Sequence, residues 1–126
     1  MARSILVVDD EPTLRETLAE ALAQNGLRVV TAADGKEALE VLEKENGNVD
    51  LILLDWKMPV MDGLEMLEIL KSSDLFKDIP VTMVSTESER HKVVEAIDKG
   101  AKNYLIKPFS QEILIGKIME GLGMDL

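Results

Sequence analysis

Cysteine is absent from the sequence, and histidine, tryptophan and tyrosine each occur once among its 126 residues. The absence of cysteine excludes disulfide bonds, thiol nucleophiles and zinc–thiolate sites. Long hydrophobic runs are absent too, because the apolar stretch near the N-terminus is short and ends in Asp9 and Asp10. That stretch suits neither a signal peptide nor a membrane span. We therefore expect a soluble, cytoplasmic protein with no membrane insertion.

Basic residues are comparatively few. The chain has 14 lysines and arginines against 24 aspartates and glutamates, which gives a formal net charge of −10. Direct nucleic-acid binding usually needs a basic face, so the composition argues against it. The acidity has a simpler explanation as well, since net charge keeps proteins soluble.

The length and the 46% hydrophobic content predict one globular domain covering residues 1–126. Apolar runs predict strands at Ser4–Val8, Leu27–Thr31, Leu51–Leu54, Pro80–Val84 and Asn103–Ile106. Helical spacing predicts four helices over Pro12 to Asn25, Asp34 to Gly47, about Asp62 to Ser72, and Gln111 to about Gly121. A further helix, the fourth in chain order, is predicted to end at Gly100 with Val93, Val94 and Ile97 facing inward. Asp34 and Ser110 are expected to cap the second and the last helix.

Five strands alternating with five helices indicate a parallel sheet with helices on both faces. The length and the strand count favour a flavodoxin-like, three-layer α/β sandwich with the strand order 2-1-3-4-5.

Polar residues stand where four of these strands end: Asp9 and Asp10, Asp55, Ser85 and Thr86, and Lys107. Because the carboxyl ends of parallel strands share one edge, where ligands bind, we expect these side chains to converge. Carboxylates close together repel, which raises some of their pKa values unless a cation compensates. Oxygen ligands with an open face suit Mg²⁺ better than a transition metal. Such a metal beside Lys107 would make an anion site next to Asp55, as phosphoryl transfer onto a carboxylate requires.

Four motifs, in this order, resemble those of response-regulator receiver domains in two-component signalling. They are VVDDE at Val7–Glu11, LLDWKMPVMDG at Leu53–Gly63, MVSTE at Met83–Glu87 and KGAKNYLIKPF at Lys99–Phe109. The resemblance covers essentially the whole chain. It implies a phosphorylation-dependent switch that assists its own phosphoryl transfer and dephosphorylation, and not an enzyme acting on a separate substrate.

The resemblance also implies a role for each site residue. Asp55 would be the phosphoacceptor. Asp10, Asp55 and the backbone carbonyl of Lys57 would bind Mg²⁺, and Asp9 would help through a water molecule. These assignments rest on matching positions in the motifs.

The implied switch involves three further residues. Ser85 would close onto the phosphoryl group, and Lys107, next to a cis Lys107–Pro108 peptide bond, would pair with it. Tyr104 would swing inward on activation. A sensor histidine kinase or a phosphotransfer protein would donate the phosphoryl group, and a downstream protein would bind the fourth helix, fifth strand and fifth helix. The chain resembles the stand-alone chemotaxis-type regulators, or else a receiver cut from a larger regulator or hybrid kinase.

Some positions near the motifs stay open. Lys57 and Glu87 are expected to face each other across the pocket mouth, where an ion pair would alter the lifetime of an aspartyl phosphate. Trp56 is either a neighbour of the phosphoacceptor that reports on it or a surface ring without a role. His91 is expected to be solvated. The wide apolar surface of the last helix is either buried or covered by a partner.

Two rival classes share parts of this pattern. A haloacid-dehalogenase-like phosphohydrolase also uses an aspartyl nucleophile, but it needs a second aspartate two residues later, where this chain has Lys57. A flavodoxin shares the fold, but the chain has few aromatic residues and no hydroxyl-rich loop after its first strand.

Overall fold

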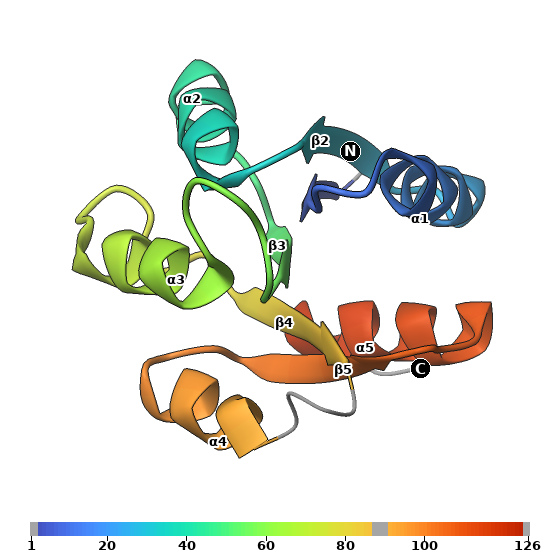
Figure 1. The fold of residues 1–126 in the computed structure, drawn as a ribbon. Helices are drawn as coiled ribbons and strands as arrows, with labels where there is room; N and C mark the ends of the chain where they lie inside the picture. The colour runs from blue at the N-terminus through green and yellow to red at the C-terminus, as the bar shows by residue number, and fades with distance from the viewer. Residues whose placement is uncertain (1–2, 87–90, 125–126) are drawn as a thin grey trace.

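The computed structural model describes residues 3–86 and 91–124 of the chain, in which strands and helices alternate (Figure 1). The strands are β1 (Ser4–Val8), β2 (Arg28–Ala32), β3 (Leu51–Asp55), β4 (Val81–Thr86) and β5 (Asn103–Lys107). The helices are α1 (Pro12–Gln24), α2 (Gly35–Lys44), α3 (Gly63–Ser72), α4 (His91–Asp98) and α5 (Gln111–Gly121).

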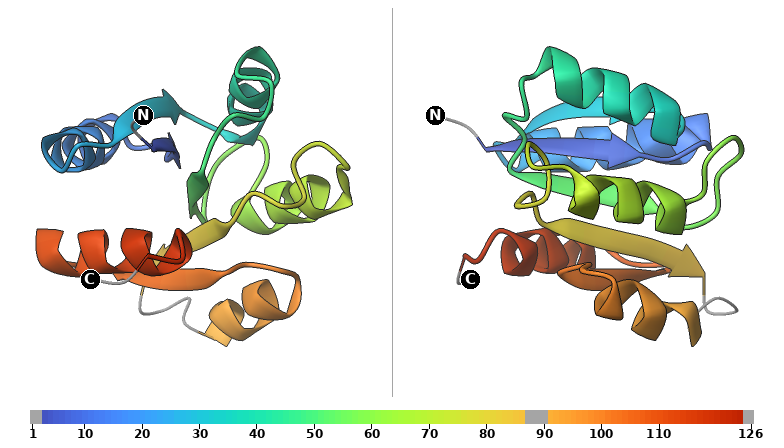
Figure 2. Two further views of the ribbon diagram at one scale, coloured as in Figure 1. Left: turned by 180° about the vertical axis from the view of Figure 1, so that it is seen from behind. Right: turned by 90° about the vertical axis from the view of Figure 1, so that its left-hand side faces the viewer.

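The strands form one parallel sheet in the order β2-β1-β3-β4-β5. Helices α2, α3 and α4 cover one face of the sheet, and α1 and α5 cover the other (Figures 1 and 2). This confirms the predicted flavodoxin-like, three-layer sandwich. The central strand β3 is buried along its whole length and pairs with β1 and β4. Because Asp55 is its last residue, the sheet itself places that carboxylate at the carboxyl edge.

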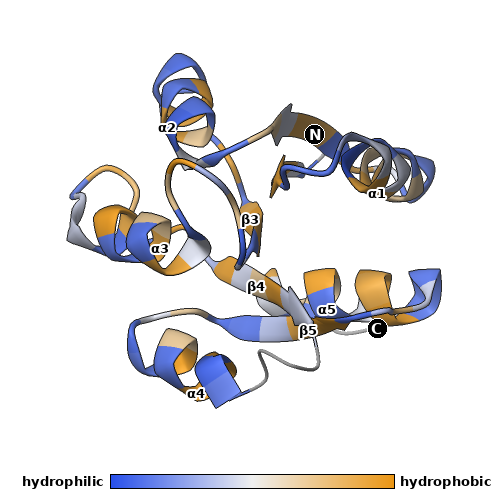
Figure 3. Ribbon diagram, in the orientation of Figure 1, coloured by the Kyte–Doolittle hydropathy of each residue, from blue (hydrophilic) through white to orange (hydrophobic). Residues whose placement is uncertain are grey.

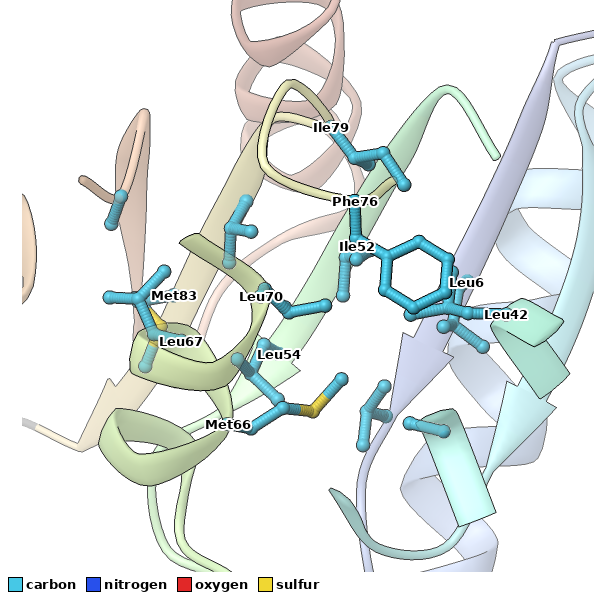
Figure 4. Packing of buried hydrophobic residues seen from close by; sticks show 14 of the residues in the cluster. Leu6, Leu42, Ile52, Leu54, Met66, Leu67, Leu70, Phe76, Ile79 and Met83 are labelled. Atoms are coloured by element: carbon cyan, nitrogen blue, oxygen red, sulfur yellow. The ribbon is translucent and has the colours of Figure 1, made fainter. Parts of the chain in front are cut away.

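The apolar core has two halves because successive side chains of a strand point to opposite faces. Ile52 and Leu54 of β3 belong to the cluster under α2, α3 and α4, whereas Leu51 and Leu53 belong to the cluster under α1 and α5. Figure 4 shows part of the first cluster, including Leu67 and its neighbours on α3. Figure 3 shows that the helices carry both hydrophobic and hydrophilic residues. A strand that contributes to both halves reads as a continuous apolar run.

Side-chain caps define where four helices begin. Asp34 and Ser110 cap α2 and α5 as predicted, each accepting a hydrogen bond from a backbone N–H of the first turn. Glu11 caps α1 and Asp62 caps α3 in the same way, which was not predicted. Such caps satisfy N–H groups that lack a partner within the helix. Glu11 and Asp62 thereby fix the chain direction directly after Asp10 and before Gly63.

The starts of β2 and β4 differ from the predictions for reasons visible in the backbone, and β2, β3, β4 and β5 each end one or two residues later than predicted. Strand β2 starts at Arg28 because the N–H of Leu27 is bonded to the carbonyl of Leu22 at the end of α1. Strand β4 starts at Val81, since Pro80 has no N–H to donate, and it runs on to Thr86. The longer β4 carries Ser85 inside the sheet.

The predicted inner face of α4 is wrong in part. Val93 is buried as predicted, but Val94 and Ile97 are 66% and 40% exposed. The second inward position is Ala96, which is fully buried. Positions 93 and 96 share one side of a helix, whereas position 94 lies about a quarter turn away. Alanine gives a weak hydropathy signal, so the two larger residues misled the prediction.

Helix α5 is largely packed against the sheet. Leu114 and Ile118 are buried, Ile115, Met119 and Leu122 are partly buried, and Ile113 is 53% exposed. Gly121 is required there, because a Cβ would collide with the side chain of Leu51. Burial therefore explains most of the apolar surface of α5.

No helix within residues 3–86 and 91–124 is both long and apolar enough to cross a membrane.

Candidate functional site

Three carboxylates meet at the carboxyl edge of the sheet. Asp9 and Asp10 follow β1 and Asp55 ends β3, and one oxygen of each lies within 4.8 Å of the others. Asp9 and Asp55 are only 2% and 6% exposed, whereas Asp10 is exposed to solvent. The predicted convergence of these acids is confirmed. Their oxygens line a small acidic cluster that is open on the side of Asp10.

Lys107 brings a positive charge to this cluster from the end of β5. Its Nζ donates to Asp9 Oδ2 at 3.5 Å and to Asp55 Oδ1 at 3.4 Å. Both distances exceed the usual range for such hydrogen bonds, so the ammonium is loosely held. About 24% of the side chain is exposed, which leaves a path for a further anion to reach it. The Lys107–Pro108 peptide bond is cis, as the resemblance implies.

The crowding of charges shows in the pKa of Asp55, which is raised from its ordinary value of 3.8 to about 6. Burial is the main cause, since it penalises the charged form, and the nearby Asp9 carboxylate adds to it. Lys107 lowers this pKa, and Asp10 raises it by the smallest contribution. Lys107 therefore does not fully offset the burial of the Asp55 carboxylate, and a bound cation would favour its charged form.

Ser85 presents a buried hydroxyl without a partner. It is 2% exposed, and its Oγ makes no hydrogen bond within the described residues. Val84, the preceding residue, pairs with Asp55 across the β3–β4 ladder, so Ser85 lies one residue past the end of β3. An unsatisfied buried hydroxyl costs free energy, and such groups in native proteins call for an explanation. A ligand oxygen bound beside Asp55 would satisfy it.

The loop after β3 is shaped by Gly63. Its N–H donates to the carbonyl of Trp56 at 2.8 Å, which closes the loop directly behind Asp55. A Cβ at position 63 would lie 2.5 Å from the carbonyl oxygen of Asp55 and 2.9 Å from Cα of Trp56. Only glycine fits this close approach. Val60 in the same loop has φ of +69°, a strained conformation for a β-branched residue.

Trp56 is not a surface ring, since it is only 7% exposed. The Nζ of Lys92, in the first turn of α4, lies 5.4 Å from the centre of its ring. A similar contact joins Lys117 of α5 to Tyr104 of β5, at 5.0 Å. Both are cation–π contacts between residues far apart in the sequence. The sequence did not predict them because no spacing links an aromatic residue on or just after a strand to a lysine on another element.

Arg15 is a further residue that the sequence did not single out. Its guanidinium donates to the backbone carbonyl of Asp9 at 2.7 Å, while the carboxylate of Asp9 accepts from the N–H of Glu11 at 2.9 Å. Together these bonds fix the backbone and the side chain of Asp9. The signal that could have found Arg15 is its place one helical turn beyond the cap Glu11, facing back toward the strand end.

The remaining predicted residues are Lys57, Tyr104, His91 and Glu87. Lys57 is exposed, and Tyr104 is half-buried on β5. His91 is exposed, which confirms that prediction. Glu87 lies outside the described residues, so its pairing with Lys57 stays a prediction.

Fold and site together define a doubly wound α/β protein with an acidic cluster, a lysine and a buried hydroxyl at one edge of its sheet. The model of the response regulator receiver domain matches residues 5–119. Known relatives agree. The chain is 37% identical to the chemotaxis protein CheY1 of Helicobacter pylori over 122 residues, which cover 96% of this chain and 98% of that protein.

Other relatives are longer. The phosphate regulon transcriptional regulatory protein PhoB of Klebsiella pneumoniae is 41% identical over 118 residues, covering 94% of this chain and 51% of that protein. Among solved structures, the chemotaxis response regulator CheY4 of Vibrio cholerae superposes with a TM-score of 0.88 at 34% identity, covering 96% of this chain and 99% of that one. The chain belongs to the response regulator receiver family, whose members act in two-component signalling.

Proposed function

We propose that residues 1–126 form one receiver domain that accepts a phosphoryl group on Asp55 and switches a protein-binding face in response. The observation that carries the proposal is the grouping of Asp9, Asp10 and Asp55 with Lys107 and with the hydroxyl of Ser85, which has no partner among the described residues. Acceptance of a phosphoryl group needs a carboxylate nucleophile, a positive charge and a hydrogen-bond donor close together, here at one edge of the sheet.

The donor set fits a hard divalent cation such as Mg²⁺, since it consists of carboxylate oxygens that lie close together and face solvent on one side. Asp10 and Asp55 would hold the ion together with the backbone carbonyl of Lys57, and Asp9 would act through a water molecule. The bound ion supplies positive charge at the phosphoryl oxygens.

Asp55 acts as the nucleophile. With its pKa raised to about 6, its carboxylate is mostly ionised at neutral pH. One of its oxygens forms the new P–O bond while the P–N bond to the histidine of the donor breaks, and the electron pair of that bond returns to the imidazole. Lys107 shifts toward the phosphoryl oxygens, and the hydroxyl of Ser85 donates to one of them.

The readout would pass through the side of the molecule made by α4, β5 and α5. A shallow hollow of about 250 Å³ lies there, lined by Val93, Val94, Ile97, Asp98 and Tyr104. Movement of Ser85 toward the phosphoryl group would reposition the end of β4, and Tyr104 would turn inward. A downstream protein would distinguish the two arrangements of this hollow, and a sensor histidine kinase or phosphotransfer protein would be the phosphoryl donor.

Intact mass after incubation with acetyl phosphate tests the proposal. We expect a gain of one phosphoryl group that requires Mg²⁺, disappears on chelation and is absent from Asp55→Asn. Asp74→Asn is the matched control, because Asp74 is fully exposed and pairs only with Lys77 among the described residues. Absence of the gain in the native chain would refute the proposal. Steady release of phosphate from a phosphate monoester would instead favour a phosphohydrolase.

A further inference from the structure

Helix α4 reaches the residue that follows β3 through a side-chain contact. Lys92, in the first turn of α4, places its Nζ 5.4 Å from the centre of the Trp56 ring. Trp56 is the residue directly after Asp55, and it is buried. The contact therefore links the neighbour of the proposed phosphoacceptor to the helix that lines the α4–β5 hollow.

The place of Lys92 in its helix is unfavourable by itself. Among the described residues, which resume at His91, the first turn of α4 contains no acidic residue, and a lysine near this end of the helix faces the positive end of the helix dipole. A cation above an indole ring gains electrostatic attraction, and this gain grows when the pair is partly withdrawn from water. Lys92 is partly buried and Trp56 is nearly fully buried, so the pair meets that condition. The contact thus offsets the unfavourable position of the lysine.

Trp56 is itself fixed tightly to the site. Its N–H donates to the carbonyl of Val84 on β4 at 2.8 Å, and its carbonyl accepts from Gly63 at 2.8 Å. These bonds fix the backbone of Trp56, and because its side chain is packed in the core, the ring has little freedom to follow α4 if the helix moves. A shift of α4 must instead lengthen or break the contact with Lys92.

We propose that Lys92 is a positioning residue whose cation–π contact with Trp56 holds α4 in its unphosphorylated arrangement. The inference rests on the proposed function of Asp55. The contact occurs together with the bonds from Lys107 to the carboxylates of Asp9 and Asp55, which a phosphoryl group on Asp55 would replace. Activation must overcome the contact. Since coupling between sites is reciprocal, loss of the contact tightens binding of a phosphoryl mimic at Asp55.

The test compares Lys92→Met, which keeps the apolar stem and removes the charge, with Lys92→Arg, which keeps a cation over the ring. Lys102→Met is the matched control, because Lys102 is exposed and its N–H pairs with Val81 at the opposite edge of the sheet. Affinity for beryllofluoride with Mg²⁺ is measured by calorimetry. We expect Lys92→Met to bind about 3- to 10-fold more tightly than the native chain, whereas Lys92→Arg and Lys102→Met stay near the native value.

A double-mutant cycle with Trp56→Leu locates the effect. On that background Lys92→Met should change the affinity no further, since the ring is already gone. Unchanged or weaker binding by Lys92→Met, or an equal gain with Lys92→Arg, would overturn the proposal. Trp56 emission measured without Mg²⁺ or the mimic reports the contact with Lys92 alone. If Lys92→Met alters this emission but the native chain does not bind beryllofluoride, the contact exists and the proposed function of Asp55 is wrong, and the coupling fails with it.

Discussion

Helices α3 and α4 lie side by side on the same face of the sheet, yet they are held in different ways (Figures 1 and 2). On α3, Met66, Leu67 and Leu70 are all fully buried. On α4, Val93 and Ala96 are the buried residues, and Ala96 is small. Because hydrophobic stabilisation follows buried apolar area, α3 is anchored far more strongly than α4.

Polar contacts replace part of that burial at the two ends of α4. Lys92 lies over Trp56 at one end, and Lys99, just after the helix, pairs with Glu68 of α3 at 3.0 Å at the other. Contacts of this kind are individually weak and can be exchanged without opening the core. Elements with few buried contacts are those that move at low cost in free energy. The difference teaches that the core fixes α3 as a platform, while α4 can shift against it.

The largest expected effect is the loss of stability when a buried side chain of α3 is removed. Leu70→Ala removes a fully buried side chain from α3 and should lower the free energy of unfolding by about 2–5 kcal/mol. Val94→Ala on α4, where the side chain is 66% exposed, should change it by no more than about 0.5 kcal/mol. Urea unfolding followed by far-UV circular dichroism measures both. Equal losses in the two variants would contradict the comparison.

A smaller loss of stability is expected at the start of α3, where Gly63 packs against the backbone of Asp55 and Trp56. In Gly63→Ala the new methyl group would press on Asp55 and Trp56, so α3 must move away at a cost of about 1–3 kcal/mol. The same urea experiment gives the loss, and Trp56 emission gives the local shift. Native stability together with a native emission spectrum would show that α3 is not fixed at its start.

The difference between α3 and α4 also explains which buried residues could be predicted from the sequence. Residues whose burial follows from a regular period were predicted well, such as Leu67 and Leu70 of α3. The buried acids, Ser85 and Lys107 were found because each stands at the end of an apolar strand. Helix α4 was misjudged since its inward positions include a small alanine, while the exposed Val94 and Ile97 carry the stronger hydropathy signal.

Contacts between distant elements lay beyond the sequence. The pairing of Lys92 with Trp56 depends on how far α4 stands from the end of β3, and no periodicity encodes that distance. The direction of the pKa shift of Asp55 was expected from the crowding of carboxylates, but its main cause is burial, which depends on the packed structure. The strand ends identified the members of the site but not their electrostatic balance.

The next expected effect concerns the carboxyl group of Asp55, which ends β3. Its pKa is raised from 3.8 to about 6, so the folded chain binds its proton more tightly than the unfolded chain does. Stability is therefore lost as pH rises from about 4 to 6 and stays lost above that range. Without divalent metal at pH 7, Asp55→Asn should be more stable than the native chain by about 1–2 kcal/mol, after allowance for solvent and Lys107.

Thermal unfolding with a chelator, at pH 4 and pH 7, measures this difference. The gain in Asp55→Asn should be present at pH 7 and nearly absent at pH 4, where the native carboxyl is protonated. Added Mg²⁺ should stabilise the native chain more than the variant, because the variant loses a charged ligand. A gain of the same size at both pH values would assign the effect to packing and not to charge.

The smallest expected effect distinguishes the ion pair of Lys99, just after α4, from the contact of Lys92 at the other end of this helix. Lys99 and Glu68 form an exposed pair that raises the pKa of Lys99, and salt screens such pairs. Lys99→Gln should lower the unfolding midpoint slightly at low ionic strength and not at high ionic strength. It should leave the beryllofluoride affinity unchanged, because Glu68 lies on the outer side of α3 and not beside Asp55. If Lys99→Gln tightened that affinity as much as Lys92→Met does, any loosening of α4 would activate the site, and the contact with Trp56 would have no special role.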